Sequence, residues 1–213
     1  MWGEGRALSW GRGRAVFRDH PPVRTWTFIG AIVVVLVVAI ALLGRKQVIN
    51  VSPPGQVILI RHAEKPADRS DAHLAPQGVQ RAEQLVAFIT TDSAMMRFGL
   101  PVALFATQTT KNNRGYRTQE TLAPLAEALK LPVQTPLRGK DYAALAQLVL
   151  ANPAYAGKTV VIAWNHEQIT QLAVALGVSP QPPEWTDTVF DRVYVISYRD
   201  GKTTLEISRY DSR

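Results

Sequence analysis

The chain has 213 residues, a length that favours one domain with an appendage. Hydrophobic residues make up 46% of it, which excludes an intrinsically disordered chain, and the lack of cysteine excludes disulfides, thiolate metal sites and a cysteine nucleophile. The net charge of +7 would by itself suggest a polyanion or a membrane surface as partner, so its distribution along the chain matters.

The positive charge is concentrated around one apolar segment. Residues 1–24 contain five arginines and two acidic residues, a net charge of +3, and Arg45 and Lys46 add two more charges. Residues 47–213 therefore carry only +2, without a run of basic residues. This distribution and the absence of a nucleic-acid-binding motif predict no nucleic-acid partner.

The apolar segment predicts a transmembrane helix over 25–44. These 20 residues carry no charge, and a helix of that length spans roughly 30 Å, the thickness of the hydrocarbon core. Because arginines precede the segment, the positive-inside rule predicts a cytoplasmic tail over 1–24 and an outer domain, periplasmic or extracellular, after a linker over 45–55. Ala39-Ile40-Ala41 leaves open a cleaved signal peptide, but the apolar run is longer than the roughly 7–15 residues of its hydrophobic region.

The remainder, 56–213, alternates between short apolar runs and amphipathic stretches. In chain order these predict a strand over 56–61, a helix over 77–90, a strand over 102–107, helices over 118–130 and 141–150 (with Asp141 as N-cap), a strand over 159–164, a helix through about Leu176, and a hairpin of strands 193–198 and 203–208. Apolar strands alternating with helices predict a three-layer α/β/α sandwich around a mostly parallel sheet. Active residues of such folds lie beyond the carboxyl ends of the strands, here at Arg61-His62 and Asn165-His166.

Four motifs in this domain resemble, in order, those of the histidine phosphatase (phosphoglycerate mutase-like) superfamily. Arg61-His62-Ala63-Glu64-Lys65 is similar to its RHG/RHAE signature, and Leu74-Ala75-Pro76-Gln77-Gly78 to its LTPxG turn. Arg117-Thr118-Gln119-Glu120-Thr121 is similar to RTxET, and Val160-Val161-Ile162-Ala163-Trp164-Asn165-His166 to the strand with the second histidine. The segment Phe190-Asp191-Arg192-Val193-Tyr194 resembles the final strand of small bacterial members. The resemblance covers most of 56–209.

The resemblance implies a role for each of four residues. His62 is the nucleophile that forms a phosphohistidine, and His166 stabilises the transferring group. Arg61 and Arg117 bind the phosphoryl oxygens, a task that suits the planar guanidinium. The scheme needs no metal and no cofactor, and its partner is a small phosphorylated substrate.

Other roles follow with less support from the motifs. The resemblance leaves the general acid open. Glu167 stands where one branch of the family has its acid, Asp141 lies in the segment where another branch has its acid, and some small members lack a dedicated acid. Lys65, His73 and Arg114 are candidates for substrate binding, although Lys65 is better explained as an exposed lysine and His73 at least as well as a surface histidine. For Glu64, by contrast, we predict a structural role.

The resemblance and the predicted anchor together imply a membrane-anchored phosphatase that hydrolyses phosphomonoesters. Its layout is similar to that of envelope phosphatases that act on sugar phosphates, which makes an envelope sugar phosphate one candidate substrate. Two alternatives stay open, a phosphoglycerate mutase-type phosphotransferase and a non-catalytic module that binds a phosphorylated ligand. Gly157-Lys158-Thr159 and His166-Glu167 resemble fragments of a P-loop and of HExxH, but neither motif is complete.

Overall fold

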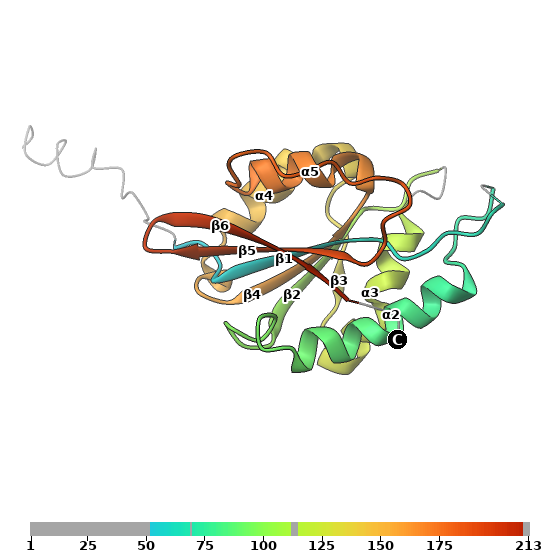
Figure 1. Cartoon of the computed structure of the whole chain (residues 1–213), viewed down its shortest axis with the longest axis horizontal. Helices are drawn as coiled ribbons and strands as arrows, with labels where there is room; N and C mark the ends of the chain where they lie inside the picture. The colour runs from blue at the N-terminus through green and yellow to red at the C-terminus, as the bar shows by residue number, and fades with distance from the viewer. Residues whose placement is uncertain (1–51, 69, 112–114, 211–213) are drawn as a thin grey trace, which may run out of the picture. The chain divides into compact units, whose positions relative to one another are not determined.

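The computed structural model describes residues 52–68, 70–111 and 115–210, and the fold is that of a mixed α/β protein (Figure 1). One six-stranded sheet has the order β3-β2-β4-β1-β5-β6. Its strands are β1 Gln56–Arg61, β2 Pro101–Ala106, β3 Val133–Gln134, β4 Thr159–Trp164, β5 Arg192–Arg199 and β6 Lys202–Arg209. The helices are α2 Pro76–Thr91, α3 Tyr116–Leu129, α4 Tyr142–Ala151 and α5 His166–Ala175, with 3₁₀ turns at Gly139–Asp141 and Pro153–Tyr155.

The predicted strands and helices of 56–213 are confirmed to within two residues at their ends, and among the described strands and α-helices only the two-residue strand β3 was not predicted. Pro76 occupies the first turn of α2, where a proline leaves no hydrogen bond unmade. Asp141 stands at the N-cap position of α4 as predicted, but its side chain makes no capping hydrogen bond.

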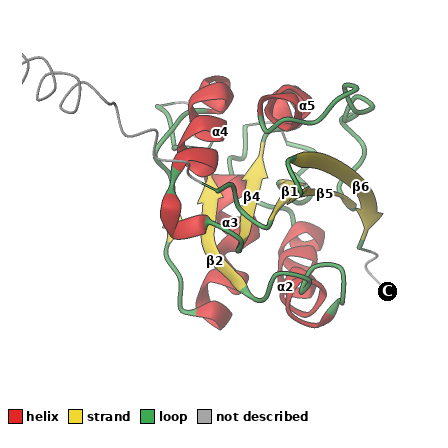
Figure 2. Ribbon diagram, turned by 90° about the vertical axis from the view of Figure 1, so that its left-hand side faces the viewer, coloured by secondary structure: helices red, strands yellow, loops and turns green. Residues whose placement is uncertain are grey.

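The apolar strands are buried on both faces, which explains why they lack the alternation of a half-exposed strand. In β1, Val57 and Leu59 belong to one hydrophobic core, while Ile58 and Ile60 belong to another. The first core includes residues of α4 and α5, and the second includes residues of α2 and α3. The helices therefore cover the sheet in pairs, one pair on each face, which gives the predicted three layers (Figure 2).

The sheet is parallel in its centre and antiparallel at one edge. β4 pairs in parallel with both β1 and β2, and β2 pairs in parallel with β3. β5 and β6 form an antiparallel hairpin beside β1. Asp200 and Gly201 at its turn both have positive φ, of 52° and 72°, as a tight two-residue hairpin turn requires.

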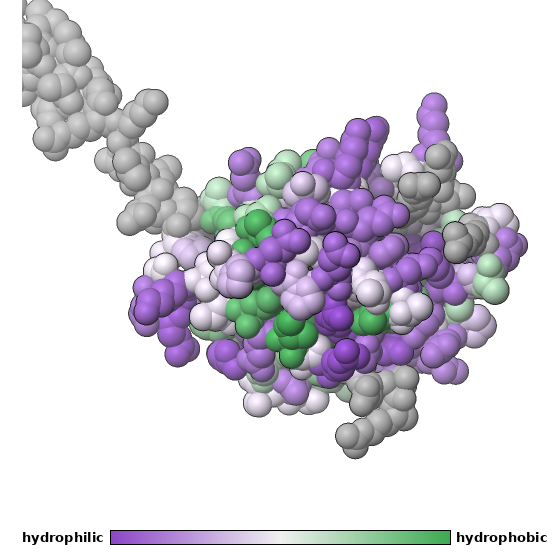
Figure 3. Space-filling view, turned by 45° about the horizontal axis from the view of Figure 1, so that its top comes forward, coloured by the Kyte–Doolittle hydropathy of each residue, from purple (hydrophilic) through white to green (hydrophobic). Residues whose placement is uncertain are grey.

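The predicted tail and transmembrane segment, with the linker up to Val51, lie outside the described residues, as does Arg114. Within the part of the chain that the structure describes, no helix is long and apolar enough to cross a membrane. Pro53 and Gly55, at the end of the predicted linker, hydrogen-bond with the backbone of Gly157 and Lys158. The face seen in Figure 3 is mostly hydrophilic, with apolar residues in small separate patches.

Candidate active site

The register of two parallel strands, β1 and β4, brings the two predicted catalytic histidines together at the carboxyl ends of these strands. Arg61, the last residue of β1, pairs with Trp164, the last residue of β4. The His62 backbone N–H then donates to the Trp164 carbonyl at 3.3 Å. His62 and His166 therefore follow neighbouring strand ends, and both line one pocket of about 150 Å³. That pocket is lined by His62, Lys65, Arg117, Asn165, His166 and Glu167.

His62 has the protonation state and tautomer of a nucleophile. Burial lowers its pKa from 6.5 to about 3, and the nearby Arg61, Arg117 and His166 act in the same direction. The ring is therefore neutral at ordinary pH, and its Nδ1–H donates to the Ala63 carbonyl at 2.7 Å. This hydrogen bond fixes the tautomer and leaves the lone pair on Nε2 available for attack.

His166 opens helix α5, directly after the N-cap residue Asn165. Burial and the Arg61 charge lower the pKa of His166. Its Nε2 lies 3.6 Å from a carboxylate oxygen of Asp187. Glu167, the next residue of the helix, is exposed and lines the same pocket, so it can reach a leaving group there.

Arg117 reaches the pocket from the first turn of α3. Its Nε donates to the His73 carbonyl at 3.0 Å, and one Nη donates to the Asp71 carbonyl. Thr121 connects this turn to the strand end, because its hydroxyl accepts from the Ala63 N–H at 2.9 Å and donates to the Arg117 carbonyl at 2.7 Å. The threonine of the RTxET-like motif thus holds α3 beside His62.

Arg61 is fully buried and does not line the pocket. Its Nη1 donates to three backbone carbonyls, those of Thr186, Asp187 and Val189, at 2.8–3.2 Å. Its Nη2 donates to the Asp187 carboxylate at 2.9 Å, and the guanidinium carbon lies 4.1 Å from the centre of the Phe190 ring. The arginine predicted to bind a phosphoryl group is therefore held by the loop before β5.

Asp187 is a site residue that the sequence did not reveal. Its carboxylate accepts from Lys65 Nζ at 2.8 and 3.1 Å as well as from Arg61. These contacts, first of all the one with Lys65, lower its pKa to about 2. An aspartate in a loop rich in proline and polar residues gives no sequence signal that separates it from a surface residue.

Glu64 lies in a buried ion pair with Arg81 of α2, in keeping with its predicted structural role. Arg81 Nε donates to the two carboxylate oxygens at 2.7 and 2.9 Å. Gly78 packs against the backbone of Glu64, and a Cβ at that position would lie 2.4 Å from the Glu64 carbonyl oxygen. The LTPxG-like turn thus needs its glycine for the close approach of α2 to the loop after β1.

Two candidate residues lie away from the pocket. His73 lines a different groove of about 540 Å³ between α2 and α3, where its Nδ1 pairs with Glu120. This contact raises the pKa of His73. The other carboxylate oxygen of Glu120 accepts from the Leu74 N–H at 2.9 Å. Asp141 is not among the residues that line the pocket with the two histidines.

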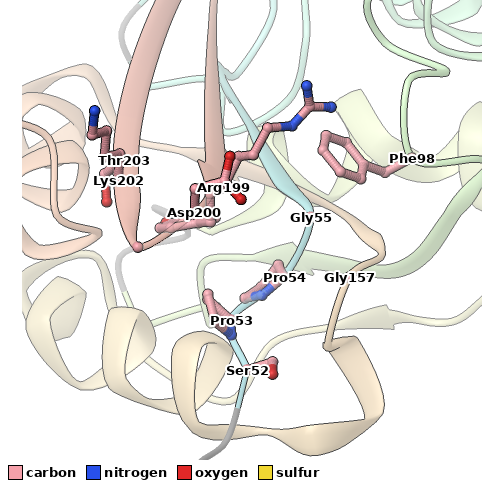
Figure 4. A pocket seen from close by; sticks show the side chains of 12 residues that line it. Ser52, Pro53, Pro54, Gly55, Phe98, Gly157, Arg199, Asp200, Lys202 and Thr203 are labelled. Carbon is pink, nitrogen blue, oxygen red and sulfur yellow. The ribbon is translucent and has the colours of Figure 1, made fainter.

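A further pocket, of about 350 Å³, lies at the opposite end of the sheet (Figure 4). Ser52, Pro53 and Pro54 line it together with the turn between β5 and β6. It contains none of the predicted site residues. Over residues 52–68, 70–111 and 115–210, no group of three or more His, Asp or Glu is placed to hold a metal ion.

No protein-family model matches the chain, and the search of curated proteins found no match. Among solved structures it is similar to a mycobacterial glucosyl-3-phosphoglycerate phosphatase in complex with VO₃, at 13% identity over 73% of this chain and 99% of that chain, with a TM-score of 0.49. It is also similar to the Entamoeba histolytica phosphoserine phosphatase in complex with 3-phosphoglyceric acid, at 16% identity, 74% and 98% coverage and a TM-score of 0.44. SixA from Agrobacterium tumefaciens shares 17% identity over 74% of this chain and 99% of that chain, with a TM-score of 0.44.

Proposed function

We propose that the chain is a phosphatase that hydrolyses phosphomonoesters through a phosphohistidine at His62. The observation that carries this proposal is the neutral, buried imidazole of His62. Its Nδ1–H donates to the Ala63 carbonyl, which leaves the Nε2 lone pair available for attack on phosphorus. Around it lie Lys65, Arg117 and His166, which are suited to bind and stabilise a phosphoryl group.

The reaction has two steps. The Nε2 lone pair of His62 attacks phosphorus, the N–P bond forms, and the bond to the leaving oxygen breaks while that oxygen takes a proton. Glu167 is the proposed donor, since its exposed carboxyl group lines the pocket. Water then attacks phosphorus and gives a proton to the Glu167 carboxylate left by the first step, the N–P bond breaks, and inorganic phosphate, neutral His62 and protonated Glu167 result. His166 donates a hydrogen bond to the phosphoryl oxygens in both steps.

The test uses the full chain, purified in detergent, with an aryl phosphate and a metal chelator. Wild-type protein should release phosphate, and His62→Ala should lose roughly 10³-fold or more in kcat/KM. Asp191→Asn is the matched control, because Asp191 pairs with Arg209 outside the pocket at 2.9 Å. Wild-type turnover in His62→Ala would contradict the proposal.

A phospho-ligand-binding module without turnover is the second candidate, and the capture of Arg61 by the loop before β5 favours it. Trapping separates the two. A labelled phosphoester quenched in alkali should leave label on His62 if the chain is a phosphatase. Tight phosphate binding without label at His62 would identify the module instead.

We also propose that residues 25–44 anchor the domain in a membrane, with the N-terminus in the cytoplasm and the catalytic domain outside it. The charge pattern on both sides of the uncharged segment supports this orientation. An envelope sugar phosphate is the proposed substrate in that location. Reporter fusions test the orientation: a C-terminal reporter that works only in the cytoplasm should be inactive, and its activity would reverse the assignment.

A further inference from the structure

The loop between α5 and β5 places a carboxylate among the cations of the proposed active site. Asp187 accepts from Lys65 Nζ at 2.8 and 3.1 Å and from Arg61 Nη2 at 2.9 Å, and lies 3.6 Å from His166 Nε2. A phosphoryl group requires the same kind of donors, since its oxygens are also anionic hydrogen-bond acceptors. Asp187 and a substrate therefore compete for these groups.

The hydrogen bonds of Arg61 show for which of its N–H donors Asp187 and a phosphoryl group would compete. Nη1 is satisfied by the three backbone carbonyls of the loop. Nε is buried and has no hydrogen-bond partner among the described residues, whereas Nη2 is held by Asp187. The Nε and Nη2 groups form one edge of the guanidinium, an edge that can bind two oxygens of one anion side by side. Asp187 occupies only half of that edge.

The backbone of the loop is held in place, whereas the side chains at its tip are exposed. Trp185 is buried and donates from Nε1 to the Val189 carbonyl at 2.8 Å, and Tyr194 donates from its hydroxyl to the Pro183 carbonyl at 2.7 Å. Between Trp185 and Val189 the residues are exposed, and the Asp187 side chain is 48% exposed. The carboxylate can therefore turn into solvent while the base of the loop stays in place.

We propose that Asp187 is an internal anionic ligand of the phosphate-binding cations and that an incoming phosphoryl group displaces it. The inference rests on the proposed function in that it takes this pocket to bind a phosphoryl group. When Asp187 is displaced, Arg61 offers Nε and Nη2 to the phosphoryl oxygens while its Nη1 stays on the loop carbonyls. Because Asp187 must first leave the cations, the Kd for phosphate is higher than it would be without Asp187. The factor is the ratio of protein with Asp187 on the cations to protein with Asp187 displaced.

Calorimetric titration of the full chain with inorganic phosphate tests this directly, because it needs no turnover. Asp187→Asn keeps the shape of the side chain but removes its charge, and should lower the Kd for phosphate at least about tenfold. Asp187→Glu keeps a carboxylate on the same tip and should stay close to wild type. Asp191→Asn, a charge removal in the same stretch of chain, should leave the Kd unchanged.

Asp187→Ser, a smaller uncharged replacement at the exposed tip, is measured alongside in case the asparagine variant is unstable. A Kd for phosphate in both uncharged variants equal to or above that of wild type overturns the displacement. A hundredfold loss of kcat with unchanged phosphate affinity would make Asp187 a proton donor and overturns it as well. In the steady state, the displacement predicts a lower KM for the two uncharged variants.

The displacement and the phosphatase proposal can fail separately. If His62 is never labelled by a phosphoester but Asp187→Asn binds phosphate more tightly, hydrolysis is refuted and the displacement stands. If His62 is labelled and the Kd does not change, the displacement is refuted and the phosphatase stands.

Discussion

The ion pair between Glu64 and Arg81 holds the loop after β1 to α2, and its removal should destabilise the domain strongly. The two side chains are only 12% and 8% exposed, so water screens the pair little. Glu64→Gln removes the negative charge and leaves buried Arg81 with two neutral acceptors among the described residues, the amide oxygen of the new glutamine and the Tyr210 carbonyl, 3.3 Å from Nη1. Loss of one partner of a buried pair costs about 3–5 kcal/mol, and we expect the lower end because Arg81 keeps these two hydrogen bonds.

Urea unfolding of the full chain, followed by tryptophan fluorescence, measures this cost. At about 1–3 kcal/mol per molar urea, a loss of about 3 kcal/mol moves the midpoint down by roughly 1–3 M. The double variant Glu64→Leu with Arg81→Met removes both charges at similar volume and should recover most of the loss. A free energy of unfolding for Glu64→Gln within 1 kcal/mol of wild type, or a double variant no more stable than the single one, would refute the assigned role.

Three further predictions concern the same corner of the fold. Because the pKa of His62 is lowered to about 3 in the folded chain, the unfolded chain binds a proton first, so stability falls as the pH drops from about 6.5 towards 3. Between pH 7 and pH 5 the His62 imidazole should lower the free energy of unfolding by about 2 kcal/mol. Urea midpoints should therefore fall less between these two pH values in His62→Gln than in wild type. Gly78→Ala should destabilise by about 1–3 kcal/mol and lower phosphatase activity, since its Cβ would lie 2.4 Å from the Glu64 carbonyl oxygen. Thr121→Val leaves the Ala63 N–H, now bonded at 2.9 Å, without its acceptor, and should cost about 1–3 kcal/mol in urea unfolding.

The central elements could be predicted because burial on both faces leaves a clear trace in the sequence. β1 and β4 are continuous apolar runs, and their ends match the predictions residue for residue. The helices of both layers show the spacing of apolar residues that packing on one face requires. β3 was not predicted because two residues, Val133 and Gln134, are too few to show any period.

The two histidines and Arg117 could be placed in one pocket because the motifs that carry them end or begin regular elements. The parallel register of β1 and β4 then determines which residues meet. His73 was harder to place, because it lies before α2 in irregular chain and its side chain turns to Glu120. No periodicity indicates which way a side chain points in such a segment.

Asp187 shows why the charge of the site could not be read from its motifs. The motifs supply two arginines and a lysine near the carboxyl ends of the strands, and their own acidic residues Glu64 and Glu120 pair elsewhere, with Arg81 and His73. The opposing carboxylate is that of Asp187, 122 residues beyond Lys65. Two interactions hold its loop in position: Trp185 donates to a carbonyl of the loop, and Arg61 donates to others. The conformation of that loop depends on tertiary contacts, so its acidic residue acquires a partner only in the folded chain. Lys65 of the pocket and Arg61 beside it are therefore already paired with Asp187 in the folded chain, and on the proposed function phosphate affinity depends on what the phosphoryl group displaces as well as on what it contacts.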